Sequence, residues 1–225
     1  MRDAPDATAP EAVRLWDLPV RLVHWSFVAL IPALWWTGEE GDLDTHKTIG
    51  LVLLALVLFR ILWGFAGSST ARFANFVRGP AAILAYLRGN DREPVVGHNP
   101  LGALSVVALL GLLLAQVGLG LFAQDVDGME SGPLSHFVSY DAADTARELH
   151  ELGFNLLMAL IVVHLLAIGW YALFRRDNLV APMVSGRKRL SGLAPRIAPL
   201  WRALVIAAIA AAFAYWISLG APLPA

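Results

Sequence analysis

The chain has 225 residues, of which 57% are hydrophobic and only 16% charged, with a formal net charge of −1 and a mean hydropathy of +0.61. Soluble domains carry about 25% charged residues, so this composition excludes a water-soluble globule and indicates an integral membrane protein. The absence of cysteine excludes disulfides, thiolate-held iron–sulfur or zinc sites, and covalent haem attachment through C-x-x-C-H. Any metal must be bound by imidazole, carboxylate or thioether groups.

Five apolar runs are long enough to cross about 30 Å of hydrocarbon as helices. In chain order they cover residues 20–37, 48–66, 101–122, 149–174 and 200–219. The first 11 residues are polar and Pro-rich and no small-residue cleavage pattern follows the first run, so we expect that run to persist as a helix rather than a cleaved signal peptide. The sequence predicts an all-α membrane bundle, with a four-helix domain in residues 1–190 and an additional transmembrane helix in residues 191–225.

Lysine and arginine favour cytoplasmic loops. Here most of them lie before the first run, in the connection between the second and third runs, or in the connection between the fourth and fifth. These residues are Arg14, Arg21, Arg72, Arg78, Arg88, Arg92, Arg175, Arg176, Arg187, Lys188, Arg189, Arg196 and Arg202. The other two connections are rich in Asp and Glu and hold only Lys47 and Arg147. We therefore expect a bacterial inner (cytoplasmic) membrane protein with a cytoplasmic N-terminus, acidic periplasmic loops and a periplasmic C-terminus.

The inner connection between the second and third runs contains an apolar stretch flanked by arginines, in residues 78–92. This pattern is typical of a short helix lying on the membrane interface, although an ordinary surface helix would have the same pattern.

Four of the six histidines, His24, His46, His150 and His164, lie within or at the ends of the apolar runs, where ionisable side chains are rare and usually functional. His150 and His164 are 14 residues apart on one helix, which separates them by about 21 Å on nearly the same face. With the orientation above, His46 lies level with His150 near the outer surface, and His24 level with His164 near the inner surface. One facing pair at each depth is what bis-histidine ligation of haem iron requires.

Alternatives to haem fit the pattern less well. Zinc usually needs four protein ligands, or three and water, and carboxylates are missing at the inner depth; a proton relay or a histidine-dependent ion transporter would not need two level pairs. The sequence therefore predicts two haem b groups, an outer one on His46 and His150 and an inner one on His24 and His164.

Cations at the two depths are candidates for pairing with haem propionates. Arg60 follows His46 by 14 residues on the same face, about 21 Å deeper, where it could bind a propionate bidentately or instead extend to the inner headgroups. Arg21, Lys47 and Arg147 are weaker candidates. We expect His98 to cap a helix or face solvent, with quinone contact or proton uptake as the alternative, and we expect His136 to be solvated.

At these residues the sequence resembles the bacterial cytochrome b561 family, which includes the b-type cytochrome subunit of Ni–Fe hydrogenases. The matching stretches include W-D-L-P-V-R-L-V-H-W at residues 16–25, H-K-T-I-G at 46–50, F-R-I-L-W-G-F-A-G at 59–67, G-H-N-P-L-G-A at 97–103 and N-L-V-A-P-M-V-S-G-R-K at 178–188. The resemblance implies a four-helix core whose haem ligands fall on the same four histidines. The fifth run lies outside that shared core and is expected to serve in packing or in docking a partner.

Bis-histidine haems leave no open iron position for oxygen chemistry, so we expect electron transfer between quinone and a periplasmic redox partner such as a cytochrome c. Two alternatives remain open. The chain could be the membrane anchor and b-type subunit of a hydrogenase or another periplasmic dehydrogenase, or it could be a superoxide:quinone oxidoreductase, an activity known in the family that the sequence resembles. The chain is thus expected to act as an electron carrier or a quinone-linked oxidoreductase of a respiratory chain. No nucleic-acid partner is expected, and the sequence leaves a homodimer open.

Overall fold

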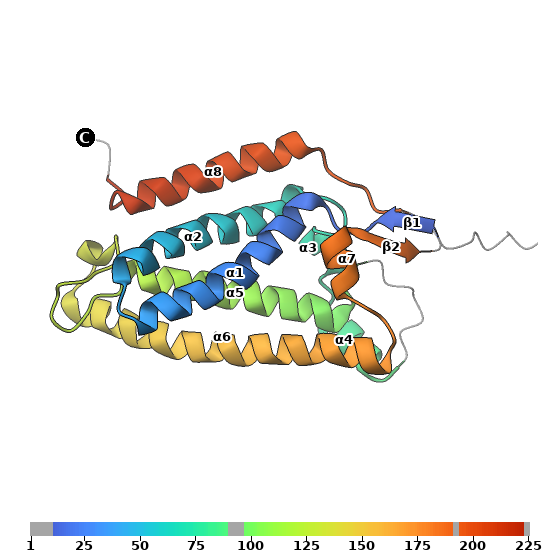
Figure 1. The fold of residues 1–225 in the computed structure, drawn as a ribbon, viewed down its shortest axis with the longest axis horizontal. Helices are drawn as coiled ribbons and strands as arrows, with labels where there is room; N and C mark the ends of the chain where they lie inside the picture. Colours follow the sequence, from blue (N-terminus) through green and yellow to red (C-terminus); the bar gives the residue numbers. More distant parts are fainter. Residues whose placement is uncertain (1–10, 90–96, 191–193, 223–225) are drawn as a thin grey trace, which may run out of the picture.

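A computed structural model describes residues 11–89, 97–190 and 194–222. The expected cytoplasmic residues 1–10, and Arg92 among the basic residues, lie outside the described residues. Five long helices run roughly along one axis, with the short elements gathered at one end (Figure 1). These helices are α1 (Leu18–Glu39), α2 (Leu43–Ala66), α5 (Pro100–Phe122), α6 (Tyr140–Phe174) and α8 (Leu200–Ser218). All five are long and apolar enough to cross a membrane, and the chain is a multi-pass membrane protein.

Polar side chains placed just before the apolar runs set where the helices begin. Asp17 accepts a hydrogen bond from the Val20 amide at 2.8 Å, and Asn99 accepts one from the Gly102 amide at 2.7 Å at the start of α5. Both side chains satisfy amides that have no partner in the first helical turn. Asp17 also accepts a 2.9 Å hydrogen bond from the indole of Trp63, so the α1 cap holds α1 and α2 together.

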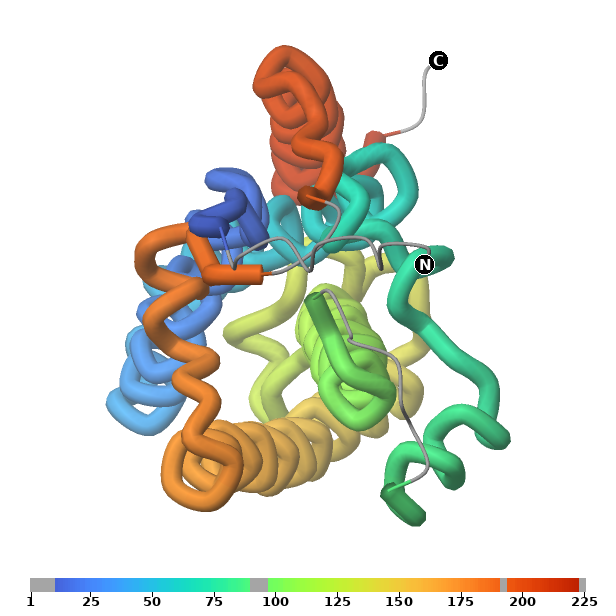
Figure 2. Tube along the Cα trace, turned by 90° about the vertical axis from the view of Figure 1, so that its right-hand side faces the viewer, coloured from blue at the N-terminus to red at the C-terminus, as the bar shows by residue number. Residues whose placement is uncertain are grey.

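Helix α2 lies at the centre of the bundle and contacts α1, α5 and α8. Its side chains Val57 and Trp63 are completely buried, and they belong to the two hydrophobic clusters that fill the interior. Helix α5 packs along α6. The view along the bundle shows α1, α2, α5 and α6 grouped together and α8 stacked outside α2 (Figure 2).

Helix α8 packs on α2 through small residues, since Ala203, Ala210 and Ala214 are buried while Leu204 and Trp201 are more than half exposed. Small residues let membrane helices approach closely, so α8 uses one face for packing and turns its large apolar side chains outward.

The short elements lie at the end of the bundle that the charge pattern assigns to the cytoplasm (Figure 1). They are strand β1 (Glu11–Arg14), helix α3 (Phe73–Phe76), helix α4 (Pro80–Leu87), helix α7 (Val180–Ser185) and strand β2 (Arg187–Leu190). The expected helix within residues 78–92 is observed as α4. The antiparallel β1–β2 pair, which joins Glu11 to Leu190 and Arg14 to Arg187, was not predicted. At the opposite end, the connection between α5 and α6 contains the 3₁₀ helix η1 (Ser135–Phe137).

Helix α6 begins nine residues before the predicted start at 149. Its N-terminal turns are rich in charged and polar side chains and are capped by Ser139, which accepts a hydrogen bond from the Ala142 amide at 3.3 Å. At 1.5 Å per residue the 35-residue helix is about 52 Å long. It is therefore longer than the roughly 30 Å of a bilayer core, and its polar turns lie at its N-terminal end.

Candidate functional site

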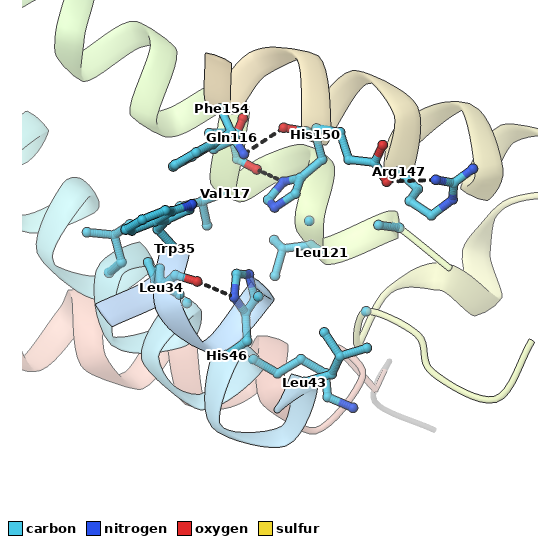
Figure 3. A pocket seen from close by; sticks show the side chains of 18 of the residues that line it. Leu34, Trp35, Leu43, His46, Gln116, Val117, Leu121, Arg147, His150 and Phe154 are labelled. Carbon is cyan, nitrogen blue, oxygen red and sulfur yellow. Dashed lines mark hydrogen bonds and ion pairs between the residues drawn. The ribbon is translucent and has the colours of Figure 1, made fainter. Parts of the chain in front are cut away.

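His46 and His150 face each other across the interior near one end of the bundle (Figure 3). Their ring centroids are 6.1 Å apart and the ring planes are inclined by 76°. An imidazole binds a metal at about 2.0–2.1 Å through a nitrogen about 1.1 Å from the ring centre, so two rings on opposite sides of one metal have centroids about 6 Å apart. The structure thus holds these two rings at a separation that would suit two imidazole ligands of one metal ion.

Backbone carbonyls of two other helices orient these rings. Nδ1 of His46 lies 2.9 Å from the Leu34 carbonyl oxygen of α1, and Nδ1 of His150 lies 2.8 Å from the Gln116 carbonyl oxygen of α5. Because a carbonyl can only accept, each Nδ1 carries the proton and donates it, which leaves each Nε2 lone pair free. This is the arrangement that fixes the tautomer and the ring direction of a metal-binding histidine.

A largely apolar cavity of about 730 Å³ surrounds the two rings. Leu34 and Trp35 of α1, Val117 of α5 and Phe154 of α6 are among its lining residues (Figure 3). Gly120 leaves room beside His150, because a Cβ at that position would lie 3.0 Å from its Cε1 atom. The volume and the lining are typical of a cofactor pocket.

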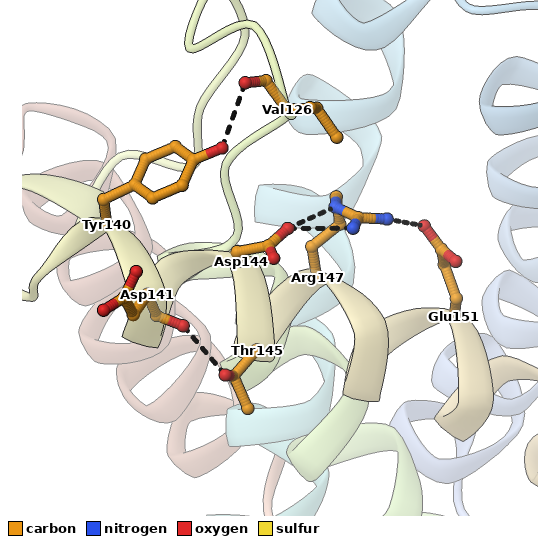
Figure 4. A network of polar contacts seen from close by, with 7 residues as sticks. All are labelled: Val126, Tyr140, Asp141, Asp144, Thr145, Arg147 and Glu151. Carbon is orange, nitrogen blue, oxygen red and sulfur yellow. Dashed lines mark hydrogen bonds and ion pairs between the residues drawn. The ribbon is translucent and has the colours of Figure 1, made fainter.

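Two cations stand at the mouth of this cavity and line it. Lys47 pairs with Glu130 at 2.7 Å and with Asp44 at 3.3 Å. Arg147 pairs with Asp144 at 2.8 Å and Glu151 at 2.7 Å (Figure 4). These ion pairs hold both cations at the outer edge of the cavity, where they could also meet a carboxylate of a bound group.

The second histidine pair lies toward the other end of the bundle. His24 belongs to α1 and His164 to α6. Nδ1 of His164 lies 3.4 Å from the Ser105 hydroxyl of α5, and the His24 ring packs edge-on against Trp25 at 5.4 Å. The pairing of His24 with His164 stays a prediction.

Arg60 lies inside the protein, with only 6% of its surface exposed. Its guanidinium donates one hydrogen bond of 3.4 Å to the Ala71 carbonyl and lies 5.4 Å from the centre of the Phe73 ring. The Arg60 side chain therefore does not extend to the headgroups. The opposite charge that acts on it is Asp17. Arg21 is engaged differently: its guanidinium donates to the carbonyls of Met183 and Val184, which fastens α7 to α1.

His98 is half-buried and its Nδ1 atom is fully buried, so the expectation of a cap or a solvated side chain is wrong. Its ring lies between Trp16, at a centroid distance of 4.7 Å, and Phe76, at 4.6 Å, and the neighbouring Asn99 supplies the α5 cap. Burial, together with the positive charge of Arg60, lowers the pKa of His98 to about 3. Its Nδ1 atom is buried with no partner among the described residues. His136 is exposed, as expected.

The sequence motifs did not identify the groups that orient the outer rings, Leu34 and Gln116. Both act through backbone carbonyls, which leave no residue-type signal. The Gln116 side chain also donates a 2.8 Å hydrogen bond to the His150 carbonyl, and a buried glutamine inside an apolar run was the one sequence feature that could have drawn attention to it. Among the described residues, no three His, Cys, Asp or Glu side chains converge as they would around a bare metal ion.

The model of the prokaryotic cytochrome b561 family matches residues 15–186. The chain belongs to this family. Curated relatives named "Probable Ni/Fe-hydrogenase B-type cytochrome subunit" include one from Bradyrhizobium diazoefficiens, 26% identical and covering 83% of this chain and 92% of its own. Another from Rhizobium leguminosarum bv. viciae is 22% identical, covering 79% and 89%, and one from Azotobacter chroococcum is 24% identical, covering 78% and 88%. No solved structure matches the chain significantly.

As a member of a b-type cytochrome family the chain binds haem b, and the outer pocket fits that group. Two imidazoles with free Nε2 atoms face each other in an apolar cavity, with cations at its mouth. Helix α8 lies beyond the stretch that the family model matches.

Proposed function

We propose that the chain is a transmembrane electron carrier with two haem b groups. His46 and His150 would hold the outer group and His24 and His164 the inner one. The observation that carries this proposal is the outer pair, whose 6.1 Å centroid separation and carbonyl-bound Nδ1 atoms suit two axial ligands of one iron.

Bound through two imidazoles, such a group would supply one-electron transfer and would leave oxygen no iron site to bind. The chain's own residues hold and insulate it. Leu34 and Gln116 carbonyls keep the Nε2 atoms directed inward, and the apolar lining excludes water. Arg60 at the inner depth and Lys47 at the outer mouth are the proposed partners of propionates, with Arg21 a weaker third because α7 carbonyls already take its donors.

The proposed location is the bacterial inner membrane, with a cytoplasmic N-terminus and a periplasmic C-terminus. Basic residues at the end that carries β1, β2 and α7 support this orientation. In this orientation the outer pair opens toward the periplasm, where the connections hold Asp42, Asp125 and Asp127 in addition to the carboxylates that pair with Lys47 and Arg147. Such a surface attracts a basic redox partner over long range.

We propose that electrons pass between this partner and quinone in the membrane. A periplasmic cytochrome c fits the acidic surface. The names of the relatives favour a second candidate, a dehydrogenase of the hydrogenase type for which this chain is the b-type subunit. Affinity purification in mild detergent, with haem staining and mass spectrometry of co-eluting chains, separates the two, because only the first yields a c-type haem protein.

The ligand assignment is tested by haem content and optical spectra of purified variants. We expect His46→Ala to lose the outer haem and His24→Ala the inner one, so that each retains about half of the wild-type haem per chain. His136→Ala, which removes an exposed histidine, is the matched control and keeps the full content. A wild-type protein without a Soret band would refute the function, and a His24→Ala protein that loses the same haem as His46→Ala would refute the pairing.

A further inference from the structure

A second cavity lies on the side of the bundle away from the histidine pairs. It is a groove of about 520 Å³ between α2, α3 and α5, lined by Ile61, Phe73, Ala74, Val77, Val107, Leu110, Gly111 and Leu114. None of these side chains carries a polar atom. In the view along the bundle, α3 and α4 stand out on the opposite side of α5 from α1 (Figure 2).

The groove opens outward, toward the space that lipid fills around a membrane protein. Val77 and Val107 on its edges are 46% and 43% exposed. Gly111 lines it without a side chain, and a Cβ at that position would meet nothing within 4 Å. An apolar hollow open to the bilayer suits a hydrocarbon chain.

The cytoplasmic end of the groove is flanked by two arginines. Arg72 directly precedes Phe73 and Arg78 directly follows Val77, so in the sequence an arginine stands on either side of the segment that lines the groove. Nε of Arg72 is buried without a hydrogen-bond partner in the described part of the chain. Neither arginine forms an ion pair with a described carboxylate, whereas Lys47 and Arg147 at the outer end are both paired.

We propose that this groove binds an anionic phospholipid, with an acyl chain along α2 and α5 and the phosphate between Arg72 and Arg78. Basic pockets between helices on the cytoplasmic side are typical sites for such headgroups. A quinone could fill the apolar part, but its neutral carbonyls would leave two guanidinium charges without a counter-charge. The proposal rests on the membrane placement of α2 and α5 and is independent of the number of haems.

Phe73 links this site to the inner end of the redox core. Its ring lines the groove and also covers the Arg60 guanidinium at 5.4 Å. A ligand that binds only the folded chain stabilises it by mass action. Lipid bound here would therefore hold Phe73 against Arg60 and raise the melting temperature of the whole protein.

The test uses the full chain, purified in detergent and delipidated. It is offered phosphatidylglycerol or phosphatidylcholine with the same acyl chains, and bound lipid is counted by native mass spectrometry alongside the melting temperature. We expect phosphatidylglycerol to be retained and to raise the melting temperature, with about thirtyfold tighter binding than phosphatidylcholine from two arginine contacts. Equal binding of the two lipids by the wild-type chain overturns the proposal without any variant.

Variants divide the site into its two parts. Arg72→Gln with Arg78→Gln should reduce phosphatidylglycerol binding to the phosphatidylcholine level, and Gly111→Leu, which fills the groove, should weaken both lipids. Arg88→Gln removes an exposed arginine of the same loop and should bind phosphatidylglycerol as the wild type does. An equal loss in Arg88→Gln overturns the proposal. Stabilisation by inorganic phosphate alone, or displacement of phosphatidylglycerol by a quinone, overturns it as well.

Discussion

The contact between α5 and α6 beside the outer histidine pair can be tested by adding a single carbon atom. In Gly153→Ala the new Cβ would lie 2.4 Å from Oε1 of Gln116, about 1 Å closer than the 3.4 Å at which ordinary contacts begin. The Gln116 amide must therefore move, and the 2.8 Å bond from its Nε2 to the His150 carbonyl is lost. Losing one such bond costs about 1–2 kcal/mol. Because alanine in place of glycine inside a helix also gains about 1 kcal/mol, the penalty is measured against Gly118→Ala, and the melting temperature should lie about 2–8 °C below that of this control.

The assay is thermal unfolding in detergent, followed by circular dichroism and by the Soret band. Gly118→Ala is the matched control, because a Cβ there meets nothing within 4 Å and alanine is the better helix former. In a Gln116→Ala background, Gly153→Ala should cost little, since the clash has been removed. Equal melting temperatures for the two glycine variants, or a full penalty in the Gln116→Ala background, would refute the reasoning.

Two further predictions concern His98 and the outer rings. The pKa of His98 is lowered to about 3 in the folded chain, against 6.5 for a free side chain. Below pH 6.5 the unfolded chain therefore binds more protons than the folded one. The free energy of unfolding is highest above that pH and falls as the pH is lowered, by about 2 kcal/mol at pH 5. Melting temperatures between pH 5 and 7.5 should therefore fall less steeply in His98→Phe, and parallel curves would contradict this. The outer rings are inclined by 76°. If both rings hold one ferric haem at this angle, its low-spin EPR signal should be strongly anisotropic and should disappear in His46→Ala. A rhombic signal, which parallel rings give, would contradict the fixed ring orientations.

Hydropathy alone predicted the membrane helices, but it could not predict where α6 begins. A hydropathy window ends the predicted helix where it reaches the charged residues Asp144, Arg147 and Glu148. The backbone hydrogen bonds of a helix do not depend on that boundary, and the Ser139 cap lets them continue to Tyr140. The outer extension of α6 is therefore held by capping and by the ion pairs of Arg147, which a hydropathy profile does not register.

Helical periodicity placed His150 and His164 on one face, because that spacing depends only on the geometry of a single helix. His98 was misjudged because its environment comes from distant segments. Trp16 precedes α1 and Phe76 belongs to α3, and together they enclose a ring that local sequence places beside a helix cap. The β1–β2 pair was missed for the same reason, since its two four-residue strands are far apart in the sequence.

The outer site explains why all four helices of the core are needed although α5 carries no histidine. His46 of α2 is oriented by a carbonyl of α1, and His150 of α6 by a carbonyl of α5. Each ring is thus fixed by a helix other than its own, and a shift of α1 or α5 along its axis would turn the Nε2 atoms away from each other. Helix α8 packs on α2 and supplies neither a ring nor an orienting carbonyl to the outer pair, so the groups that fix the two rings come from α1, α2, α5 and α6.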